Sequence, residues 1–204
     1  MIKSKQIETL IKHFKLAETS RENHKLGIEI EHFLVHKKSL KAVTFNEKDG
    51  IEDILKVLTK KNWSPIIEKN HIIGLNKQTM DISLEPGGQI EVSINPKTNL
   101  KQIETDYLSF LKDIIPVLKK RDQILLTLGY QPVSSIQDIP ILPKKRYHYM
   151  YDYFKDKGKY AHNMMKGTAS IHVNFDYSNE QDYVKKIKIA SFLSPIIYCI
   201  LDNT

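Results

Sequence analysis

The stretch DISLEPGGQIEVSI, residues 81–94, decides the fold of this chain. Proline and glycine favour the backbone angles of tight turns, so Pro86-Gly87-Gly88 predicts a corner between two strands, at residues 80–85 and 89–95. Side chains alternate between the two faces of a strand. The acidic residues of this hairpin therefore share a face with small polar residues, opposite a row of aliphatic residues. No lysine lies on that acidic face, although the chain carries a formal net charge of +7.

The hydrophobic pattern predicts further elements on both sides of the hairpin. Apolar residues three or four apart predict helices, and apolar residues two apart predict strands. Before the hairpin we expect a helix at about 4–19, a strand at about 25–38, a helix at 49–62 and one or two short strands between 63 and 75. After it we expect a long helix at 97–122 that contains Pro116, a strand at 124–133, a tyrosine-rich helix ending near 154, a strand at 168–177 and a helix from about 180. This order predicts an α+β fold with a mainly antiparallel sheet and helices packed on one face.

The composition is that of a globular domain. The chain has 204 residues, of which 41% are hydrophobic and 27% charged, and this length suits one compact domain over residues 1–204. No apolar run is long enough to cross a bilayer, and the start MIKSKQIETLIKHFK is typical of an amphipathic helix rather than a signal peptide. We therefore expect no membrane partner. The single cysteine, Cys199, excludes an internal disulfide, and we expect a cytoplasmic location.

The positive charge is mostly lysine and is spread along the chain. The only arginines are Arg21, Arg121 and Arg146, although arginine is the residue best suited to bidentate contacts with phosphates and bases. We therefore expect no nucleic-acid partner. Residues 143–160, PKKRYHYMYDYFKDKGKY, keep that alternative open, because tyrosines can stack on bases while lysines follow phosphates. The favoured interpretation of this segment is an amphipathic helix with half-buried tyrosines.

Three separate segments predict strands with one polar and one apolar face. In GIEIEHFLV the carboxylates of Glu29 and Glu31 share a face, with His32 on the other side among aliphatic residues. The hairpin and TASIHVNFDY repeat the pattern, with polar faces made of Asp81, Ser83 and Glu85, of Gln89, Glu91 and Ser93, and of Thr168, Ser170, His172 and Asn174. The simplest interpretation is a sheet with one face in water. A water-facing surface of a lysine-rich chain should carry lysines, however, and these positions hold almost none.

Carboxylates that share a face repel one another unless a cation lies between them. Hard divalent cations such as Mg²⁺ take carboxylate and phosphate oxygens as ligands. The polar faces therefore predict a platform for magnesium and a nucleoside triphosphate. Other nucleotide and metal sites lack their motifs, because the sequence contains no Walker glycine loop, no GxGxxG after a strand and no HExxH, and one cysteine cannot form a thiolate zinc site.

Five segments carry a resemblance to a known enzyme family. In chain order they are GIEIEHFLV, ISLEPGGQIEVS, DIPILPKKRY, MMKGTASIHVNFD and SFLSPIIYCILDN. Together they resemble the motifs of the glutamate-cysteine ligases of the plant and proteobacterial type, within the glutamine-synthetase-like superfamily of carboxylate-amine ligases. LEPGGQIEVS is the most specific of these pieces. The resemblance runs from about residue 27 to the last residue.

The resemblance implies an ATP-dependent ligase with a glutamine-synthetase-like catalytic lobe. In that reaction the γ-carboxylate of glutamate is phosphorylated by ATP, and the amine of cysteine displaces phosphate to give γ-glutamylcysteine, the first step of glutathione biosynthesis. The implied substrates are glutamate, cysteine and ATP, and the implied cofactors are ATP and Mg²⁺. By position, the resemblance implies metal ligands at Glu29, Glu31, Glu85 and Glu91, catalytic roles for Glu29, Glu85 and Arg146, and substrate contacts from Gln89, Arg146, Met165, Thr168, Ser170, His172 and Asn174.

The sequence departs from the family pattern in two respects, and alternatives follow from them. The family more often has glutamine where His172 stands, so a γ-glutamyl ligase with another amine acceptor is an alternative. Family members also continue for roughly as long again beyond the last residue, so we expect this chain to be the N-terminal part of a longer catalytic domain. The missing C-terminal half or a partner chain would then supply further contacts. A non-catalytic module that binds a ligand on a ligase-like fold is the other alternative. For Arg146, the alternative to a substrate contact is a surface charge at the start of a helix.

Overall fold

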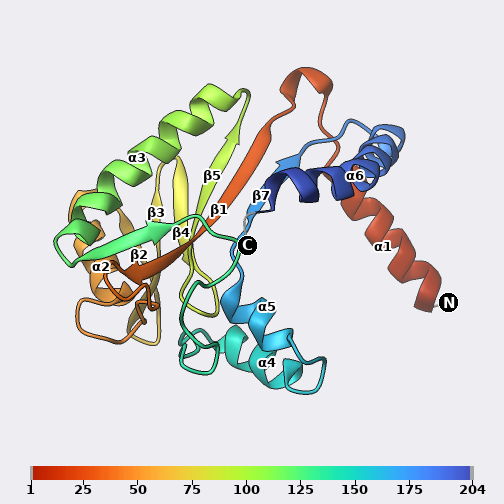
Figure 1. Cartoon of the computed structure of the whole chain (residues 1–204). Coiled ribbons are helices and arrows are strands. Elements are labelled where there is room, and N and C mark those ends of the chain that lie inside the picture. Colours follow the sequence, from red (N-terminus) through yellow and green to blue (C-terminus); the bar gives the residue numbers. More distant parts are fainter. Residues whose placement is uncertain (1, 203–204) are drawn as a thin grey trace.

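The computed structural model describes residues 2–202, with side chains from Lys5 onward. A seven-stranded sheet forms the centre of the molecule, and helices lie on one of its faces and around its edge (Figure 1). The strands are β1 (Leu26–His36), β2 (Ser64–Glu68), β3 (His71–Lys77), β4 (Met80–Leu84), β5 (Ile90–Lys97), β6 (Gln123–Leu126) and β7 (Ile171–Phe175). The helices are α1 (Ile2–Leu16), α2 (Ile51–Leu58), α3 (Leu100–Lys119), α4 (Lys145–Phe154), α5 (Ala161–Gly167) and α6 (Glu180–Leu201), with short 3-10 turns at Arg21–Asn23 and Thr59–Lys61. The α+β prediction is confirmed.

The sheet is antiparallel in every described pair, with the strands in the order β2-β3-β4-β5-β1-β6 and β7 paired with β1. Strand β1 is the longest, and its two halves have different partners on one edge. Its first half pairs with β7, from Leu26 to Ile30, and its second half pairs with β6, from Phe33 to His36. The register sets Glu31 opposite Glu91. Segments that lie far apart in the sequence therefore meet around β1.

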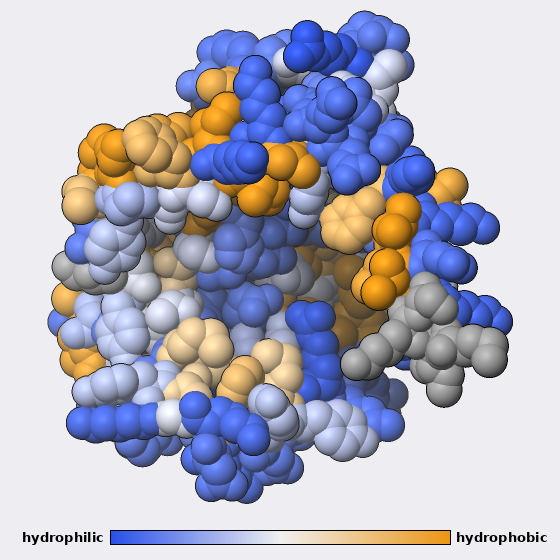
Figure 2. Space-filling model, turned by 90° about the vertical axis from the view of Figure 1, so that its right-hand side faces the viewer, coloured by the Kyte–Doolittle hydropathy of each residue, from blue (hydrophilic) through white to orange (hydrophobic). Residues whose placement is uncertain are grey.

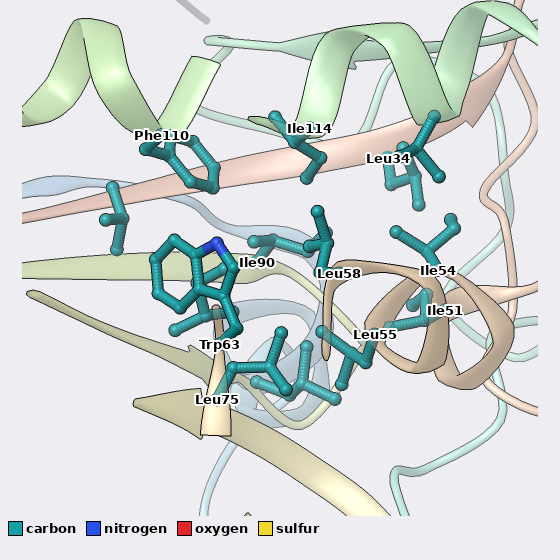
Figure 3. Packing of buried hydrophobic residues seen from close by; sticks show 14 of the residues in the cluster. Leu34, Ile51, Ile54, Leu55, Leu58, Trp63, Leu75, Ile90, Phe110 and Ile114 are labelled. Carbon is teal, nitrogen blue, oxygen red and sulfur yellow. The ribbon is translucent and has the colours of Figure 1, made fainter. Parts of the chain in front are cut away.

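The hydrophobic core lies between the apolar face of the sheet and helices α2 and α3 (Figure 3). Helix α2 presents Ile51, Ile54, Leu55 and Leu58 to the sheet at helical spacing, and all four are fully buried. Asn99 begins α3, where its side chain accepts a hydrogen bond from the backbone N–H of Gln102 at 3.1 Å; such a cap satisfies an otherwise unpaired amide of the first turn. Pro116 lies inside α3, which continues to Lys119.

One histidine belongs to this core. The side chain of His32 is fully buried, with Nε2 2.8 Å from the hydroxyl of Tyr107 on α3 and Nδ1 3.2 Å from the carbonyl oxygen of Ile90. Burial lowers the pKa of this imidazole, because the charged form loses its hydration. His32 therefore lies on the apolar side of β1, opposite to the glutamates, as the alternation predicted.

The corner of the hairpin is packed tightly from two sides. Gly88 has φ of +87°, in the region that favours glycine, and a Cβ added there would lie 2.6 Å from Cδ1 of Ile51. A Cβ added to Gly87 would lie 2.4 Å from the carbonyl oxygen of Lys166. Gln89 is buried and bridges the same corner to the segment before β7: its Oε1 accepts from Gly87 N at 2.9 Å and its Nε2 donates to the Thr168 carbonyl at 2.7 Å. Close contacts therefore require glycine at both positions, and at Gly88 the backbone angle requires it as well.

The expectation that the helices pack on one face of the sheet holds for α2 and α3 only. Helices α1 and α6 extend away from the sheet, and α4 and α5 form a lobe beside the hairpin corner (Figure 1). Helix α6 exposes apolar side chains on all sides, and the outward face of β7 is exposed as well; the residues are Ile171, Val173, Phe175, Val184, Ile187, Ile189, Phe192, Leu193, Ile196, Ile197, Tyr198, Ile200 and Leu201. Across the described residues, no helix is both long and apolar enough to span a membrane.

Three element predictions differ from the structure. Helix α5 was not predicted, because AHNMMKG is short and its apolar residues show no clear period. The strand expected at 168–177 is shorter, since β7 begins only at Ile171. Thr168 instead pairs as an isolated bridge with Tyr130, at the end of the segment that was predicted to be a strand to residue 133 but is a strand only to Leu126. Tertiary packing of α5 against this region replaces the local strand pattern.

Candidate functional site

The polar face of the sheet gathers carboxylates from three separate segments. Glu29 and Glu31 come from β1, Glu91 comes from β5, and Glu85 follows β4 at the corner. Antiparallel pairing places Glu29 opposite His172 of β7 and Glu31 opposite Glu91. Figure 2 shows a hollow on the side of the molecule away from α2 and α3, with hydrophilic side chains in its middle and hydrophobic side chains beside and above it.

Glu91 occupies the middle of this face. One of its oxygens, Oε1, accepts hydrogen bonds from the hydroxyls of Ser83 at 2.8 Å and Ser93 at 3.1 Å. These two serines are its neighbours on the same face, one across the hairpin and one two residues along the strand. They hold the carboxylate in position without neutralising its charge, so the group is oriented and still able to bind a cation.

A second arrangement joins β1 to β7. Nδ1 of His172 lies 3.0 Å from Oε2 of Glu29, and Nε2 of the same ring lies 2.9 Å from the hydroxyl of Ser170. Atoms of Glu29, Glu91 and His172 that could bind a metal all lie within 4.8 Å of one another. Among the described residues, this is the group of three such side chains that the geometry singles out. The sequence predicted His172 as a substrate contact and did not predict it beside the metal ligands.

Glu31 lies next to this group and is held by the backbone of the segment before β7. Its Oε2 accepts a hydrogen bond from Ser170 N at 2.8 Å. Burial raises the pKa of Glu31, and the charge of Glu91 adds to that rise, while the Ser170 amide and His172 oppose it. A carboxylate whose charge is disfavoured in this way gains most from a bound cation.

Glu85 lies where the hairpin meets the α4 lobe, and its carboxyl also has a raised pKa. Burial raises the pKa of its carboxyl, and Glu91 and Glu31 raise it further; Lys144 and Arg146 act in the opposite direction. Its Oε1 is 3.3 Å from the hydroxyl of Tyr147. The carboxylates of the predicted ligands therefore interact electrostatically. Glu31 and Glu85 fall outside the group formed by Glu29, Glu91 and His172. The ligand role of all four glutamates stays a prediction.

Arg146 lies in the first turn of α4 and is exposed. It donates a hydrogen bond from Nη2 to the Tyr147 hydroxyl at 2.7 Å, and that hydroxyl donates to the Leu84 carbonyl at 2.7 Å. Arg146 thus begins a short chain of contacts that ends at the hairpin corner. Its position agrees with both interpretations, the surface charge and the partner of a substrate carboxylate.

Lys144 and Tyr147 are site residues that the sequence analysis missed. Lys144 is buried and donates from Nζ to the Leu84 carbonyl at 2.8 Å. Burial and the nearby Arg146 lower the pKa of Lys144 to about 8, and Glu85 acts against that shift. Both residues stand in DIPILPKKRY, one of the five motifs quoted above. The signal was available there, because Tyr147 directly follows the only arginine of that motif and Lys144 precedes it by two positions.

The other predicted substrate residues are divided between the core and two shallow pockets. Met165 and Gln89 are buried, and the amide of Gln89 is already bonded at both ends. Asn174 lines a pocket of about 350 Å³ together with Glu29, Asp81 and Ser93. Thr168 donates to the Met164 carbonyl at 2.7 Å and lines a different pocket of about 540 Å³, with Tyr130, Tyr160, Asn163 and Met164. Ser170, His172 and Asn174 thus lie toward the glutamates, whereas Thr168 lies on the α5 side.

The segment weighed for nucleic-acid binding has more exposed tyrosines than expected. Tyr147 is buried, but Tyr149, Tyr153 and Tyr160 are exposed, and Tyr151 stacks on His162 with ring centroids 4.0 Å apart. Lysines lie over several of these rings, at 4.8 to 5.9 Å from the centroids. The expectation of half-buried tyrosines was therefore wrong for most of α4, because the helix is covered on one side only.

The donor set of the site fits a divalent cation. Two carboxylates and one imidazole converge from three strands, and no lysine or arginine forms an ion pair with Glu29, Glu31, Glu85 or Glu91 among the described residues. Carboxylate oxygens are the preferred ligands of hard divalent ions, and imidazole nitrogen is a common ligand of transition-metal ions. The arrangement can thus hold an ion in front of the sheet. The exposed Arg146 lies at one end of the face to meet a negatively charged group, and the buried Lys144 lies behind the corner.

Comparison with known proteins finds relatives among the glutamate-cysteine ligases of plants. The chain is 35% identical over 198 residues to glutamate-cysteine ligase A, chloroplastic, of Oryza sativa subsp. japonica. This match covers 97% of this chain and 40% of that protein. It is 36% identical over 185 residues to ligase B of the same organism, covering 90% of this chain and 37% of that protein. The glutamate-cysteine ligase of Arabidopsis thaliana is 31% identical over 198 residues, and the match covers 97% of this chain and 37% of that protein. The chain therefore spans about two fifths of the length of these relatives.

The names of these relatives contradict the cytoplasmic location that was expected from the sequence. The proteins from rice, Arabidopsis thaliana and Solanum lycopersicum are all named chloroplastic. The expectation rested on the amphipathic character of the first residues and on a single cysteine. A single cysteine does not distinguish the cytoplasm from the interior of a plastid, because both compartments are reducing. An amphipathic first helix does not distinguish them either.

The family assignment agrees with the motifs and with the site. The family model described as glutamate-cysteine ligase family 2 matches residues 25–200, which include β1, the hairpin, the α4 segment and β7. All four glutamates of the polar face lie within the matched region. The relatives that cover nearly the whole of this chain bear the same enzyme name. The chain belongs to the glutamate-cysteine ligase family 2.

Proposed function

We propose that this chain is the N-terminal part of the catalytic domain of an ATP-dependent glutamate-cysteine ligase and carries its metal platform. The overall reaction joins the γ-carboxyl of glutamate to the amine of cysteine and converts ATP to ADP and phosphate. The observation that carries the proposal is the meeting of Glu29, Glu91 and His172 from three strands on one face, flanked by Glu31 and Glu85. Family membership supports the choice of reaction.

The roles of the residues follow from their positions. Bound Mg²⁺ would neutralise the phosphates of ATP and the charge that develops on the transferred phosphoryl group, which is the main form of catalysis in such transfers. Glu29 and Glu91 would hold the ion, with Glu31 and Glu85 beside them. The two serines bonded to Glu91 would keep its carboxylate in position to hold the ion. Because the preferred geometry is fixed before the ion arrives, little reorganisation is needed when it binds.

The basic end of the face would receive the amino-acid substrate. Arg146 is exposed next to Glu85, and its planar guanidinium suits a bidentate contact with a carboxylate. Lys144 adds positive charge from behind the corner. Asn174 and Ser170 would provide polar contacts from β7 and the segment before it. The remaining nucleotide and cysteine contacts would come from polypeptide that corresponds to the other three fifths of the relatives, in the same chain or in a partner chain.

A measurement of ADP release in the complete gene product tests this proposal. We expect release from Mg-ATP only when glutamate and cysteine are both present, with γ-glutamylcysteine as product. Glu91→Gln should lower the rate by about 100-fold or more, because loss of one charge-stabilising group at a reacting centre commonly has that effect. Glu104→Gln is the matched control, since Glu104 is exposed on α3 and contacts only Lys101 among its ion pairs. Its rate should equal that of the unchanged protein.

Two other outcomes would replace the proposal with one of its alternatives. If another amine gave a faster reaction than cysteine, the chain would belong to a γ-glutamyl ligase of different acceptor specificity. If Mg-ATP bound without any ADP release in the presence of glutamate and a panel of amines, the chain would be a binding module. Binding of single-stranded RNA in place of Mg-ATP would favour the α4 segment as the functional surface.

A further inference from the structure

Tyr147 is a buried tyrosine whose hydroxyl joins an exposed arginine to the corner of the hairpin. The hydroxyl accepts a hydrogen bond from Nη2 of Arg146 at 2.7 Å and donates one to the Leu84 carbonyl at 2.7 Å. The same oxygen lies 3.3 Å from Oε1 of Glu85. Tyr147 is only 1% exposed, whereas Arg146 is exposed. One hydroxyl therefore contacts a cation, the corner and a carboxylate at the basic end of the polar face.

The start of α4 is fastened to the sheet by two further hydrogen bonds. Lys144 Nζ donates to the same Leu84 carbonyl at 2.8 Å. The backbone N–H of Lys145 donates to Oε1 of Glu68 on β2 at 2.8 Å, and a carboxylate at this place suits the partial positive charge of a helix N-terminus. These bonds hold the first turn of α4 against the corner, so Tyr147 meets the corner from a fixed base.

The guanidinium of Arg146 is supported by Tyr147 and still able to bind a ligand. Its Cζ lies 4.7 Å from the centroid of the Tyr147 ring, so the ring contacts the cation as well as the hydroxyl does. A guanidinium carries five N–H donors. Among the described residues, Tyr147 is the hydrogen-bond partner of this guanidinium. The other donors can therefore form a bidentate contact with a carboxylate.

An arginine that is already held loses less freedom when it binds a ligand. The long side chain of arginine has many rotamers, and ordering it costs conformational entropy. Contacts that restrict the side chain in the free protein remove part of this cost. Tyr147 restricts Arg146 from the buried side, away from the solvent that a ligand would displace. We therefore expect its hydroxyl to affect the binding of a carboxylate rather than the chemical step.

We propose that Tyr147 is a positioning residue for the amino-acid substrate: its hydroxyl orients the guanidinium of Arg146 toward a substrate carboxylate and fixes its place relative to Glu85. Because Tyr147 is buried, it acts through Arg146 and does not touch the substrate. The inference rests on the substrate contact that the proposed function gives to Arg146.

Tyr147→Phe tests the inference, because it removes the hydroxyl and keeps the ring. The fold should survive, since the Leu84 carbonyl still accepts from Lys144, and thermal melting checks this. Binding of glutamate to the complete gene product, measured by calorimetry, should weaken about tenfold, the size of the loss of one hydrogen bond to a charged group. Binding of Mg-ATP should be unchanged. Tyr153→Phe is the matched control, since Tyr153 is 64% exposed on the same helix, and it should change neither.

Steady-state rates distinguish positioning from a loss of folded protein. In Tyr147→Phe the KM for glutamate should rise about tenfold, while kcat and the KM values for cysteine and ATP stay unchanged, because only ground-state binding of one substrate is weakened. A merely structural role would instead lower kcat, through loss of active molecules, and leave every KM unchanged. That second pattern would overturn the inference.

A double variant shows whether Tyr147 acts through Arg146. In the Arg146→Ala background, Tyr147→Phe should not lower kcat/KM for glutamate any further, because the side chain that it positions is gone. Equal losses in both backgrounds would contradict the inference. Unchanged glutamate binding in Tyr147→Phe, or no glutamate binding to the unchanged protein, would contradict it as well.

The result is separable from that of the proposed function. If Tyr147→Phe weakens glutamate binding and no γ-glutamyl product forms with any amine, the positioning inference stands and the proposed reaction fails. If ligase activity is found and Tyr147→Phe changes neither the binding of glutamate nor its KM, the reaction stands and the positioning inference fails.

Discussion

At the scale of single residues, the site is a group of carboxylates whose charged forms lower the stability of the folded chain. Glu31 and Glu85 both have a raised pKa, chiefly from burial and with a contribution from Glu91. A folded protein that buries a charged side chain is commonly less stable than a variant with a neutral residue at the same position. The pH dependence of stability therefore reports on the site directly.

Glu85→Gln should stabilise the metal-free chain at neutral pH. A carboxyl whose pKa is higher in the folded than in the unfolded state binds more protons when folded, so the free energy of unfolding falls as the pH rises from the unfolded value through the raised one. The ordinary value is 4.5. We expect a higher melting temperature for Glu85→Gln at pH 7 in a chelator, and no difference below pH 4.5. Glu104→Gln on exposed α3 should match the unchanged chain at both pH values.

An equal melting temperature for Glu85→Gln and the unchanged chain at pH 7 would mean that Lys144 and Arg146 fully compensate the burial of Glu85. In the expected case, in which Glu85→Gln melts at the higher temperature, 10-fold increments of Mg²⁺ should narrow the difference between the two melting temperatures, because only the unchanged carboxylate gains from the ion. A constant difference would contradict a role of Glu85 near the metal.

At the scale of the element, the hairpin β4–β5 depends on its corner. Gly88→Ala should lower the free energy of unfolding by about 1 to 3 kcal/mol, the range for a strained backbone position, and contact with Ile51 adds to that loss. Gly158 is the matched control, since its φ is +150° and an added Cβ there meets nothing within 4 Å. Urea denaturation of both alanine variants separates strain from contact. Equal losses would show that the fit against α2 contributes nothing.

The element scale also shows what the sequence could and could not predict. Alternation placed Glu29, Glu31, Glu85 and Glu91 on one face, because a pleated strand has only two faces to offer. It could not predict that Lys144 and Tyr147 reach the Leu84 carbonyl, because that contact depends on the path of a loop between distant segments. Nor could alternation predict that Thr168 lies outside strand β7. The hydroxyl of Thr168 donates a hydrogen bond to the Met164 carbonyl of α5, and local sequence patterns carry no information on such a contact.

At the scale of the whole molecule, the sheet is covered by helices on one part of its apolar face and left open near β7. Phe192 and Ile200 on α6 are 75% and 72% exposed. Exposed apolar area of this extent favours association with another surface. The relatives have about three fifths of their length outside the matched part.

The purified chain should therefore self-associate through α6. We expect the double variant Phe192→Ser, Ile200→Ser to shift the chain toward monomer in sedimentation or light-scattering measurements, with nearly the same urea midpoint because both side chains are exposed. Lys185→Ser with Lys188→Ser on the same helix is the matched control and should leave association unchanged or stronger. If the serine variant stayed as associated as the unchanged chain, another surface would be responsible.

The pairing of β7 with β1 has a consequence for the order of events during synthesis. Glu29 leaves the ribosome before its strand partner His172, which lies 143 positions later in the sequence. The hairpin can fold onto β1 while β7 is still being made, since β4 and β5 precede it by about eighty residues. His172 therefore reaches Glu29 only when β7 docks onto β1. The polar face is thus assembled only after this later strand has been made.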